Sequence, residues 1–270
     1  MTPPVPLDEA MDPERFGGKA AGLARALHAG LPAPPGFALS AEFVDAVAER
    51  MPAALSALSE LARKLEPSVA VRSSAIGEDS SSASFAGQHK TLLNVASASG
   101  LESAVREVWL SARSASALAY RARLGLTERS IRMGVVVQPM LDPETAGVLF
   151  TRNPVSGADE RVVEAALGLG ESVVMGLVTP DLYRLARGGR LLEARAGTKD
   201  TQIRPAPDGG TLECEVTGAL ATQCCLEAAQ LEALERLASA CERVFDGPRD
   251  LEWAFVNGKL FLLQCRAVTR

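Results

Sequence analysis

The chain has 270 residues, of which 47% are hydrophobic and 23% charged, and its net charge of −5 gives no sign of a nucleic-acid surface. Its five cysteines never occur as C-x-x-C, which argues against a zinc site or a disulfide scaffold and favours a reducing cytoplasm. Because no apolar run reaches membrane-spanning length, we expect a cytoplasmic protein with neither membrane nor nucleic-acid partners.

The first predicted helix opens at Gly17-Gly18-Lys19 and ends before Gly30. A glycine pair at a helix start lets the backbone approach an anion, and the helix N-terminus adds positive potential. Lys19 is therefore a candidate phosphate ligand, although a surface lysine after a turn explains the same pattern. Two further helices are predicted over residues 41–50 and 53–65, where apolar residues recur at helical spacing.

A short buried strand, Val69–Val71, runs into a segment rich in serine and glycine that extends from Arg72 to Gln88. Small residues and hydroxyls can lie against a polyphosphate, and Arg72 at the strand end would pair with phosphate. The alternative is a flexible serine-rich linker. Phe85 and the strand predicted over Thr91–Val95 favour an ordered segment.

A helix is predicted over residues 101–124, followed by a continuous apolar strand, Ile131–Val137. That strand leads into Gln138-Pro139-Met140. A strand that stops at a proline presents backbone groups suited to reading an adenine edge, although Pro139 can equally be only a strand terminator.

Three more elements are predicted in the second half of the chain, namely strands over 146–151 and 161–165 and a helix over 223–245. The region from 186 to 219 is polar and Gly-rich and suggests no element. The helix over 223–245 is the clearest in the sequence, and we expect it to support the elements that follow it.

The final stretch contains two alternating runs around Asn257-Gly258, a strong signal for a β-hairpin. A two-residue turn alone would place Glu252 and Gln264 on opposite faces. We therefore predict a three-residue loop over Val256–Gly258, with Gly258 as a left-handed bulge. One face of the hairpin is then apolar, and its members are Leu251, Trp253, Phe255, Phe261, Leu263 and Cys265.

The opposite face of this hairpin would bring Asp250, Glu252, Gln264 and Arg266 together at its open end. Carboxylate and amide oxygens are ligands that Mg²⁺ takes, and a guanidinium beside them suits a phosphate chain. The alternative is an edge hairpin whose charges at the open end are simply solvated.

In combination, these segments resemble the nucleotide-binding domain of the phosphoenolpyruvate synthase and pyruvate phosphate dikinase family, which also contains the rifampin phosphotransferases. The matching stretches are collinear and cover nearly the whole chain. They are Gly17-Gly18-Lys19-Ala20-Ala21-Gly22-Leu23, Pro35-Gly36-Phe37, Val71-Arg72-Ser73-Ser74, Glu78-Asp79, Ser84-Phe85-Ala86-Gly87-Gln88, Val137-Gln138-Pro139-Met140, Gly147-Val148-Leu149-Phe150-Thr151-Arg152-Asn153-Pro154, Gly168-Leu169-Gly170-Glu171, Thr179-Pro180-Asp181 and the final hairpin.

The resemblance implies an α+β, ATP-grasp domain over residues 1–270, with lobes at about 1–137 and 138–270 that clamp ATP. The residues it implies for phosphate binding and catalysis are Lys19, Arg72 and Arg266. Those implied for the lid loop are Gly87 and Gln88, and those for the adenine are Gln138 and Met140. Those implied for Mg²⁺ are Glu252 and Gln264, with Asp250 nearby.

The resemblance does not extend to the family's phosphohistidine domain or to its acceptor domain. The two histidines, His28 and His89, both lack the Thr-Ser-His type of context. We therefore expect a component that uses Mg-ATP to phosphorylate a histidine on a separately encoded partner, with AMP as a product. The alternatives are a stand-alone small-molecule kinase, for which His89 is the best candidate base, and a regulatory module that binds ATP without turnover.

Overall fold

The computed structural model describes residues 2–77, 90–115, 118–119 and 131–268, and the chain divides into two compact units. Unit 1 comprises Met1–Arg25, Pro35–Met140 and Ala206–Gly210. Unit 2 comprises Ala26–Pro34, Leu141–Pro205 and Thr211–Arg270. Each unit combines an antiparallel sheet with helices, which confirms the predicted α+β class.

Unit 1 contains a five-stranded antiparallel sheet in the order β1-β2-β5-β3-β4. Its strands are β1 (Val5–Pro6), β2 (Phe37–Leu39), β3 (Ser68–Ala75), β4 (Thr91–Ala96) and β5 (Met133–Pro139). The helical segments of the N-terminal half are η1 (Leu7–Glu9), α1 (Pro13–Phe16), α2 (Gly18–His28), α3 (Ala41–Ala48), α4 (Pro52–Lys64) and α5 (Ala98–Ser111).

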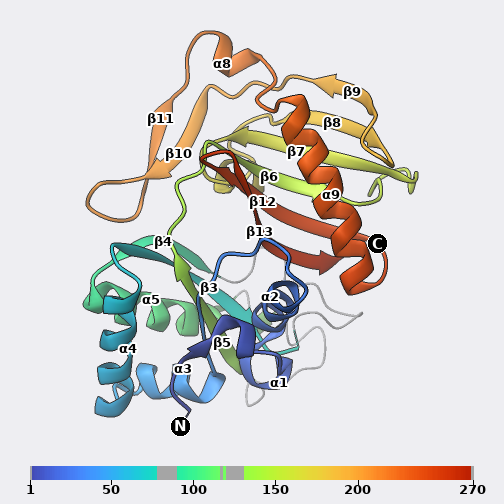
Figure 1. Ribbon diagram of the computed structural model, residues 1–270. Coiled ribbons are helices and arrows are strands. Elements are labelled where there is room, and N and C mark those ends of the chain that lie inside the picture. The colour runs from blue at the N-terminus through green and yellow to red at the C-terminus, as the bar shows by residue number, and fades with distance from the viewer. Residues whose placement is uncertain (1, 78–89, 116–117, 120–130, 269–270) are drawn as a thin grey trace. The chain divides into compact units, whose positions relative to one another are not determined.

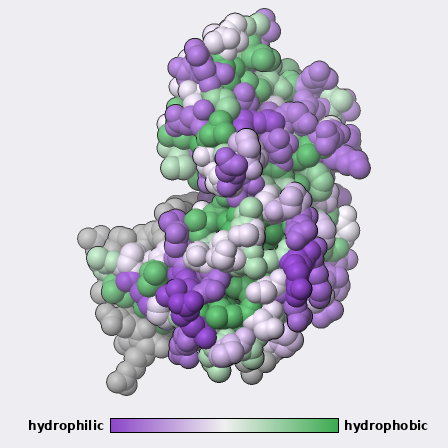
Figure 2. All heavy atoms as spheres, turned by 90° about the vertical axis from the view of Figure 1, so that its left-hand side faces the viewer, coloured by the Kyte–Doolittle hydropathy of each residue, from purple (hydrophilic) through white to green (hydrophobic). Residues whose placement is uncertain are grey.

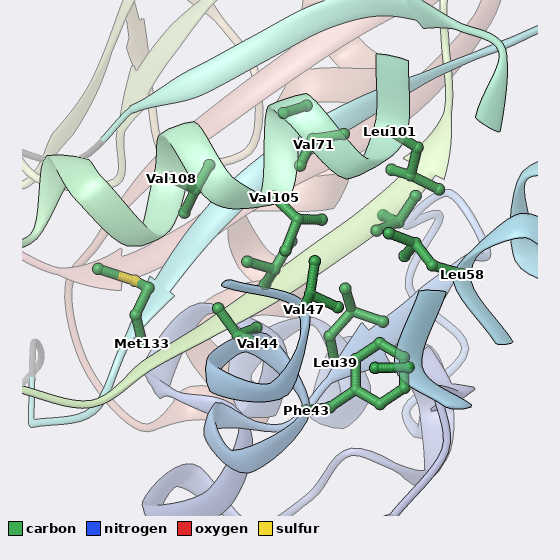
Figure 3. Packing of buried hydrophobic residues seen from close by; sticks show 14 of the residues in the cluster. Leu39, Phe43, Val44, Val47, Leu58, Val71, Leu101, Val105, Val108 and Met133 are labelled. Atoms are coloured by element: carbon green, nitrogen blue, oxygen red, sulfur yellow. The ribbon is translucent and has the colours of Figure 1, made fainter. Parts of the chain in front are cut away.

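The core of unit 1 lies between this sheet and helices α3, α4 and α5 (Figure 1). Figure 3 shows Val44 and Val47 of α3 and Val105 and Val108 of α5 among the side chains that form this core. Val71 of β3 is fully buried in the same cluster. Because alternate residues of a strand point to opposite faces, the residues next to Val71, including Arg72, lie on the other face of the sheet.

Unit 2 contains a six-stranded antiparallel sheet in the order β13-β12-β6-β7-β8-β9. Its strands are β6 (Thr145–Phe150), β7 (Glu160–Leu167), β8 (Asp181–Ala186), β9 (Leu191–Arg195), β12 (Arg249–Val256) and β13 (Lys259–Ala267). A separate hairpin and the helices complete the C-terminal half, namely β10 (Thr201–Pro205), β11 (Thr211–Glu215), α7 (Glu171–Val174), α8 (Ala219–Thr222) and α9 (Ala228–Phe245).

Helix α9 covers one face of this sheet, where it contacts β6, β12 and β13 (Figure 1). A buried ion pair joins it to the sheet: Arg161 Nε donates to Glu235 Oε2 at 2.7 Å, and the Arg161 side chain is fully buried. The expected support of the terminal hairpin by this helix is therefore confirmed.

Two helices are shorter than the sequence predicts. Helix α9 begins at Ala228 instead of residue 223, because Cys225 N–H donates to Asp181 Oδ2 and Leu226 N–H to Tyr183 Oη, at 2.7 and 2.9 Å. Helix α5 ends at Ser111, where the predicted helix runs to 124; Ala115, Leu118 and Ala119 are helical again, and residues 116–117 and 120–124 lie outside the described residues. The Ser111 hydroxyl donates to Val108 O at 2.7 Å, a side-chain bond that competes with helix continuation.

The described helices include none with both the length and the apolar character needed to cross a bilayer. On the face shown in Figure 2, hydrophilic and hydrophobic residues are interspersed.

Candidate functional site

The terminal hairpin places Glu252 directly opposite Gln264, and Asp250 directly opposite Arg266. Directly paired residues of antiparallel strands carry their side chains on the same face. The predicted polar cluster at the open end of the hairpin is therefore present, and it lies on the face opposite to α9.

The irregularity that produces this pairing is not at the turn, so the predicted three-residue loop is wrong. Val256 pairs with Lys259 across a two-residue turn, in which Asn257 and Gly258 both have positive φ, 50° and 72°. The register shifts between Glu252 and Trp253, and Leu263 is the extra residue on β13. An Asn-Gly pair tolerates the left-handed conformation that a two-residue turn requires.

The apolar face differs from the prediction for the same reason. Trp253 lies opposite Leu262, and Phe255 opposite Leu260. Phe261 lies opposite Ala254 on the other face and is not part of the apolar set, and neither is the bulged Leu263. The face under α9 is therefore formed by Leu251, Trp253, Phe255, Leu260, Leu262 and Cys265.

Asp250 and Arg266 form an ion pair, with Arg266 Nε donating to Asp250 Oδ2 at 2.7 Å. The Asp250 side chain is only 9% exposed. Burial raises the pKa of Asp250, the Arg266 guanidinium opposes that rise, and the neighbouring Glu252 carboxylate adds to it.

This donor set fits a hard divalent cation. Two carboxylates and one amide, from Asp250, Glu252 and Gln264, supply only oxygen ligands, which Mg²⁺ prefers. Within the described ranges, no three His, Cys, Asp or Glu side chains converge as a metal cluster. A magnesium ion here would therefore use the Gln264 amide and water in addition to carboxylate, as Mg²⁺ commonly does.

Glu164 is a residue of this face that the sequence analysis missed. It lies opposite Val148 on β6, and Val148 in turn lies opposite Glu252. Glu164 and Glu252 thus share one cross-strand row, about 10 Å apart at two strand spacings. Glu164 is the one charged residue in the otherwise apolar stretch Val162–Leu167, and this was the signal that could have drawn attention to it.

In unit 1, Lys19 contacts β3, the strand that contains Arg72. Lys19 Nζ donates to the carbonyl oxygen of Ser73 at 2.9 Å, and Ser73 follows Arg72 in β3. Gly17, which precedes helix α2, allows α2 to approach β3 this closely, because a Cβ at Gly17 would lie 2.0 Å from Ser74 O. The close approach that the Gly17-Gly18 pair allows is thus to strand β3.

Arg72 lies in the interior of β3, not at the strand end where the sequence analysis put it, since β3 extends from Ser68 to Ala75. Arg72 is opposite Val136, and Gln138 is two residues further along β5. Arg72 and Gln138 are therefore diagonal neighbours on one face of the sheet. Both are largely buried, at 8% and 3% exposure.

Met140 follows β5, and its backbone N–H donates to Ser68 O at 2.9 Å. This backbone donor, which a strand end was expected to leave for a base, is already used by the protein. The Met140 sulfur accepts from Asn94 N–H at 3.3 Å. Gly87 and Gln88, the predicted lid residues, and His89 lie outside the described residues.

The site residues thus form two groups. One group, Lys19, Arg72, Gln138 and Met140, belongs to unit 1, and the other, Asp250, Glu252, Gln264 and Arg266, belongs to unit 2. In the first group, the cationic side chains suit phosphate, and the amide and the thioether suit a base. The second group offers oxygen ligands for a metal ion together with a guanidinium for phosphate.

Comparison with known proteins gives a consistent result. Residues 39–270 match the family model described as "Pyruvate phosphate dikinase, AMP/ATP-binding domain". A probable phosphoenolpyruvate synthase from Methanothermobacter thermautotrophicus is 33% identical over 299 residues, covering 94% of this chain and 44% of that protein. A second, from Archaeoglobus fulgidus, is 34% identical over 298 residues, covering 94% of this chain and 39% of that protein.

A rifampicin phosphotransferase from Streptomyces sviceus is 38% identical over 201 residues, covering 74% of this chain and 23% of that protein. The chain therefore spans less than half the length of these three relatives.

Proposed function

Because this chain belongs to the pyruvate phosphate dikinase AMP/ATP-binding domain family, we propose that it binds Mg-ATP and uses it to phosphorylate a histidine on a separate partner protein. AMP and phosphate are the eventual products. Supporting this proposal, relatives named phosphoenolpyruvate synthase and rifampicin phosphotransferase are much longer than the chain, which covers 44% and 23% of their lengths. The protein acts in the cytoplasm, in keeping with its five free thiols.

The observation that carries the proposal is the pairing of Glu252 with Gln264 and of Asp250 with Arg266. Glu252 and Gln264 hold Mg²⁺, with Asp250 as a neighbouring carboxylate. A bound magnesium ion neutralises the charge of the phosphate chain. Arg266 contacts the phosphate chain of the nucleotide, while its Nε donates a hydrogen bond that holds Asp250 in place.

Lys19 and Arg72 hold the phosphates from unit 1, and Gln138 and Met140 take the adenine. Gly87 and Gln88 contribute to a lid over the nucleotide. Phosphoryl transfer needs little covalent chemistry from the protein, so these residues act by positioning the phosphates and by neutralising charge.

The test is to incubate the protein with Mg²⁺ and phosphate-labelled ATP, alone and with the products of neighbouring genes. We expect acid-labile label on a partner histidine and conversion of ATP to AMP, both abolished by EDTA. Release of ADP would contradict the dikinase-type reaction. Turnover without any partner would instead indicate a small-molecule kinase, and binding without turnover in every mixture would indicate a regulatory module.

A further inference from the structure

Asn94, near the end of β4, connects three segments of unit 1. Its backbone N–H donates to the Met140 sulfur at 3.3 Å. Its side-chain Nδ2 donates to Ala206 O at 2.7 Å and to Gly210 O at 2.9 Å. Its carbonyl oxygen accepts from Gly210 N at 3.0 Å. Asn94 is 7% exposed, so all these bonds are made in a largely buried position.

The turn that Asn94 holds, residues 206–210, joins β10 to β11. It is closed by Ala206 N–H donating to Gly210 O at 3.0 Å. The turn belongs to unit 1, whereas both strands that it joins belong to unit 2. Three hydrogen bonds between the turn and β4 are made by Asn94, which makes this residue the main polar anchor of the turn.

The same residue fixes the segment that takes the base in the proposed function. Met140 is held at its backbone by Ser68 and at its sulfur by Asn94. A thioether is flexible and polarizable and packs well against an aromatic ring, but only a restrained one presents a defined surface. Asn94 thus restrains the Met140 side chain and the turn 206–210 from a single position.

We propose that Asn94 is a positioning residue for the adenine end of the nucleotide site, where it holds Met140 and the turn 206–210 as one wall against the base. This inference rests on the proposed function. It adds to that function a residue on β4 and a turn from a distant part of the chain.

Asparagine suits this position for two reasons. Its φ of 54° is left-handed, a conformation that asparagine tolerates better than most residues. Its amide also supplies two donors for two carbonyl oxygens, which an aspartate carboxylate would repel. Asn94→Gly therefore removes the side-chain bonds while keeping the backbone conformation, and Asn94→Asp replaces them by repulsion.

The experiment compares two probes by calorimetry in the presence of Mg²⁺, namely ATP and inorganic tripolyphosphate, which has no base. Loss of two buried hydrogen bonds should weaken ATP binding about tenfold in Asn94→Gly, and further in Asn94→Asp. Tripolyphosphate binding should stay within about twofold of wild type, because the phosphate ligands are untouched. Asn257→Gly is the matched control, since Asn257 also has a left-handed φ, of 50°, and it should bind both probes like wild type.

A second measurement needs no variant. In the wild-type protein, ATP should slow amide hydrogen exchange of the turn 206–210, and tripolyphosphate should not. Equal loss of both probes in Asn94→Gly, unchanged ATP binding, or an identical effect of both probes on exchange of the turn would overturn the inference. Failure of the proposed function has a different signature, because the wild-type protein would then not bind ATP at all.

Discussion

At the scale of single residues, adjacent side chains along β12 lie on opposite faces of the sheet and serve different purposes, the proposed metal binding on one face and core packing on the other. Glu252 faces the polar side with Gln264, whereas Trp253 is fully buried under α9. Asp250, two residues before Glu252, returns to the polar side and pairs with Arg266. Since alternation along a strand separates the two faces, substitutions one position apart should separate loss of function from loss of stability.

Glu252→Ala should weaken binding of Mg-ATP at least about tenfold, because even residues that only orient a metal ligand change affinity by roughly 10–100-fold. The unfolding free energy should change little, since the removed carboxylate is on the polar face. Titration calorimetry with Mg-ATP and denaturant unfolding measure the two effects. Lys259→Ala, at the turn end of the same hairpin, is the control and should bind normally; a Glu252→Ala protein that also binds normally would refute the metal role.

Trp253→Ala should lower the unfolding free energy by about 3–5 kcal/mol, because it removes a buried aromatic side chain and leaves a cavity. Trp253 is 0% exposed and packs edge-to-face on Phe255, with ring centroids 5.5 Å apart. Trp253→Phe, which keeps a ring in the site, should cost less. Chemical denaturation monitored by circular dichroism would measure both, and equal losses would argue against a cavity effect.

Glu160 should make the stability of the protein depend on acid pH. Hydrogen bonds from Arg184, and then from Asn153, lower the pKa of Glu160 below its usual value. A lowered pKa in the folded state means that ionised Glu160 stabilises the fold, and that this contribution is lost as pH falls from about 4.3 through the folded-state pKa. Glu160→Gln should flatten the acid side of the stability curve, whereas exposed Glu232→Gln should leave it unchanged; parallel curves for all three proteins would count against this account.

At the scale of elements, the packing of α2 against β3 depends on a glycine. Gly17 has φ 87° and ψ 166°, a region that essentially only glycine occupies. Ala20 N–H donates to Ser74 Oγ at 3.0 Å, and Lys19 Nζ to Ser73 O at 2.9 Å. The position of Lys19 against β3 is therefore determined by how α2 packs on this strand.

Gly17→Ala should displace the start of α2, because the new Cβ would lie 2.0 Å from Ser74 O. Gly30→Ala provides the control, since Gly30 also has a positive φ, of 73°, but a Cβ added there would meet no atom within 4 Å. We expect Gly30→Ala to cost about 1–2 kcal/mol of backbone strain. Gly17→Ala should cost more and should also weaken ATP binding, as thermal unfolding and calorimetry would report; equal stability losses would contradict the clash.

At the scale of the whole molecule, the chain crosses repeatedly between two units, each with its own sheet and core. Unit 2 contains a fully buried ion pair, Lys199 Nζ to Asp181 Oδ1 at 2.5 Å. The second oxygen of Asp181 accepts from Cys225 N–H, and Lys199 Nζ also donates to Gln223 O. This network fastens the segment before α9 to strand β8.

Lys199→Met should destabilise unit 2 by about 3–5 kcal/mol, because it leaves a buried carboxylate without its counter-ion. Arg236→Met is the control, since the Arg236–Glu232 pair is about two-thirds exposed on both sides and should contribute less than about 0.5 kcal/mol. Peptide-resolved hydrogen exchange should show the loss in β8 and α9, with α3–α5 of unit 1 unchanged. Uniform loss across both units would show that they unfold together.

The sequence by itself determined the α+β class, the family, most of the helices and strands, and the polar cluster of the terminal hairpin. The cluster was predictable although the bulge was misplaced, because one extra residue anywhere between Glu252 and Gln264 restores the same side-chain parity. The β10–β11 hairpin was missed, although Pro207-Asp208-Gly209 is a turn signal that could have revealed it.

Only the tertiary structure decided the start of α9, the position of Arg72 within β3, the location of the bulge and the anchoring of the 206–210 turn by Asn94. Two of these depend on a partner far away in the chain: Asp181 and Tyr183 for the start of α9, and Asn94 for the turn. The local pattern of apolar and polar residues indicates which face of an element is buried, because every residue on that face has to be apolar. It does not record which distant donor or acceptor satisfies a particular backbone group, because that pairing exists only once the chain has folded.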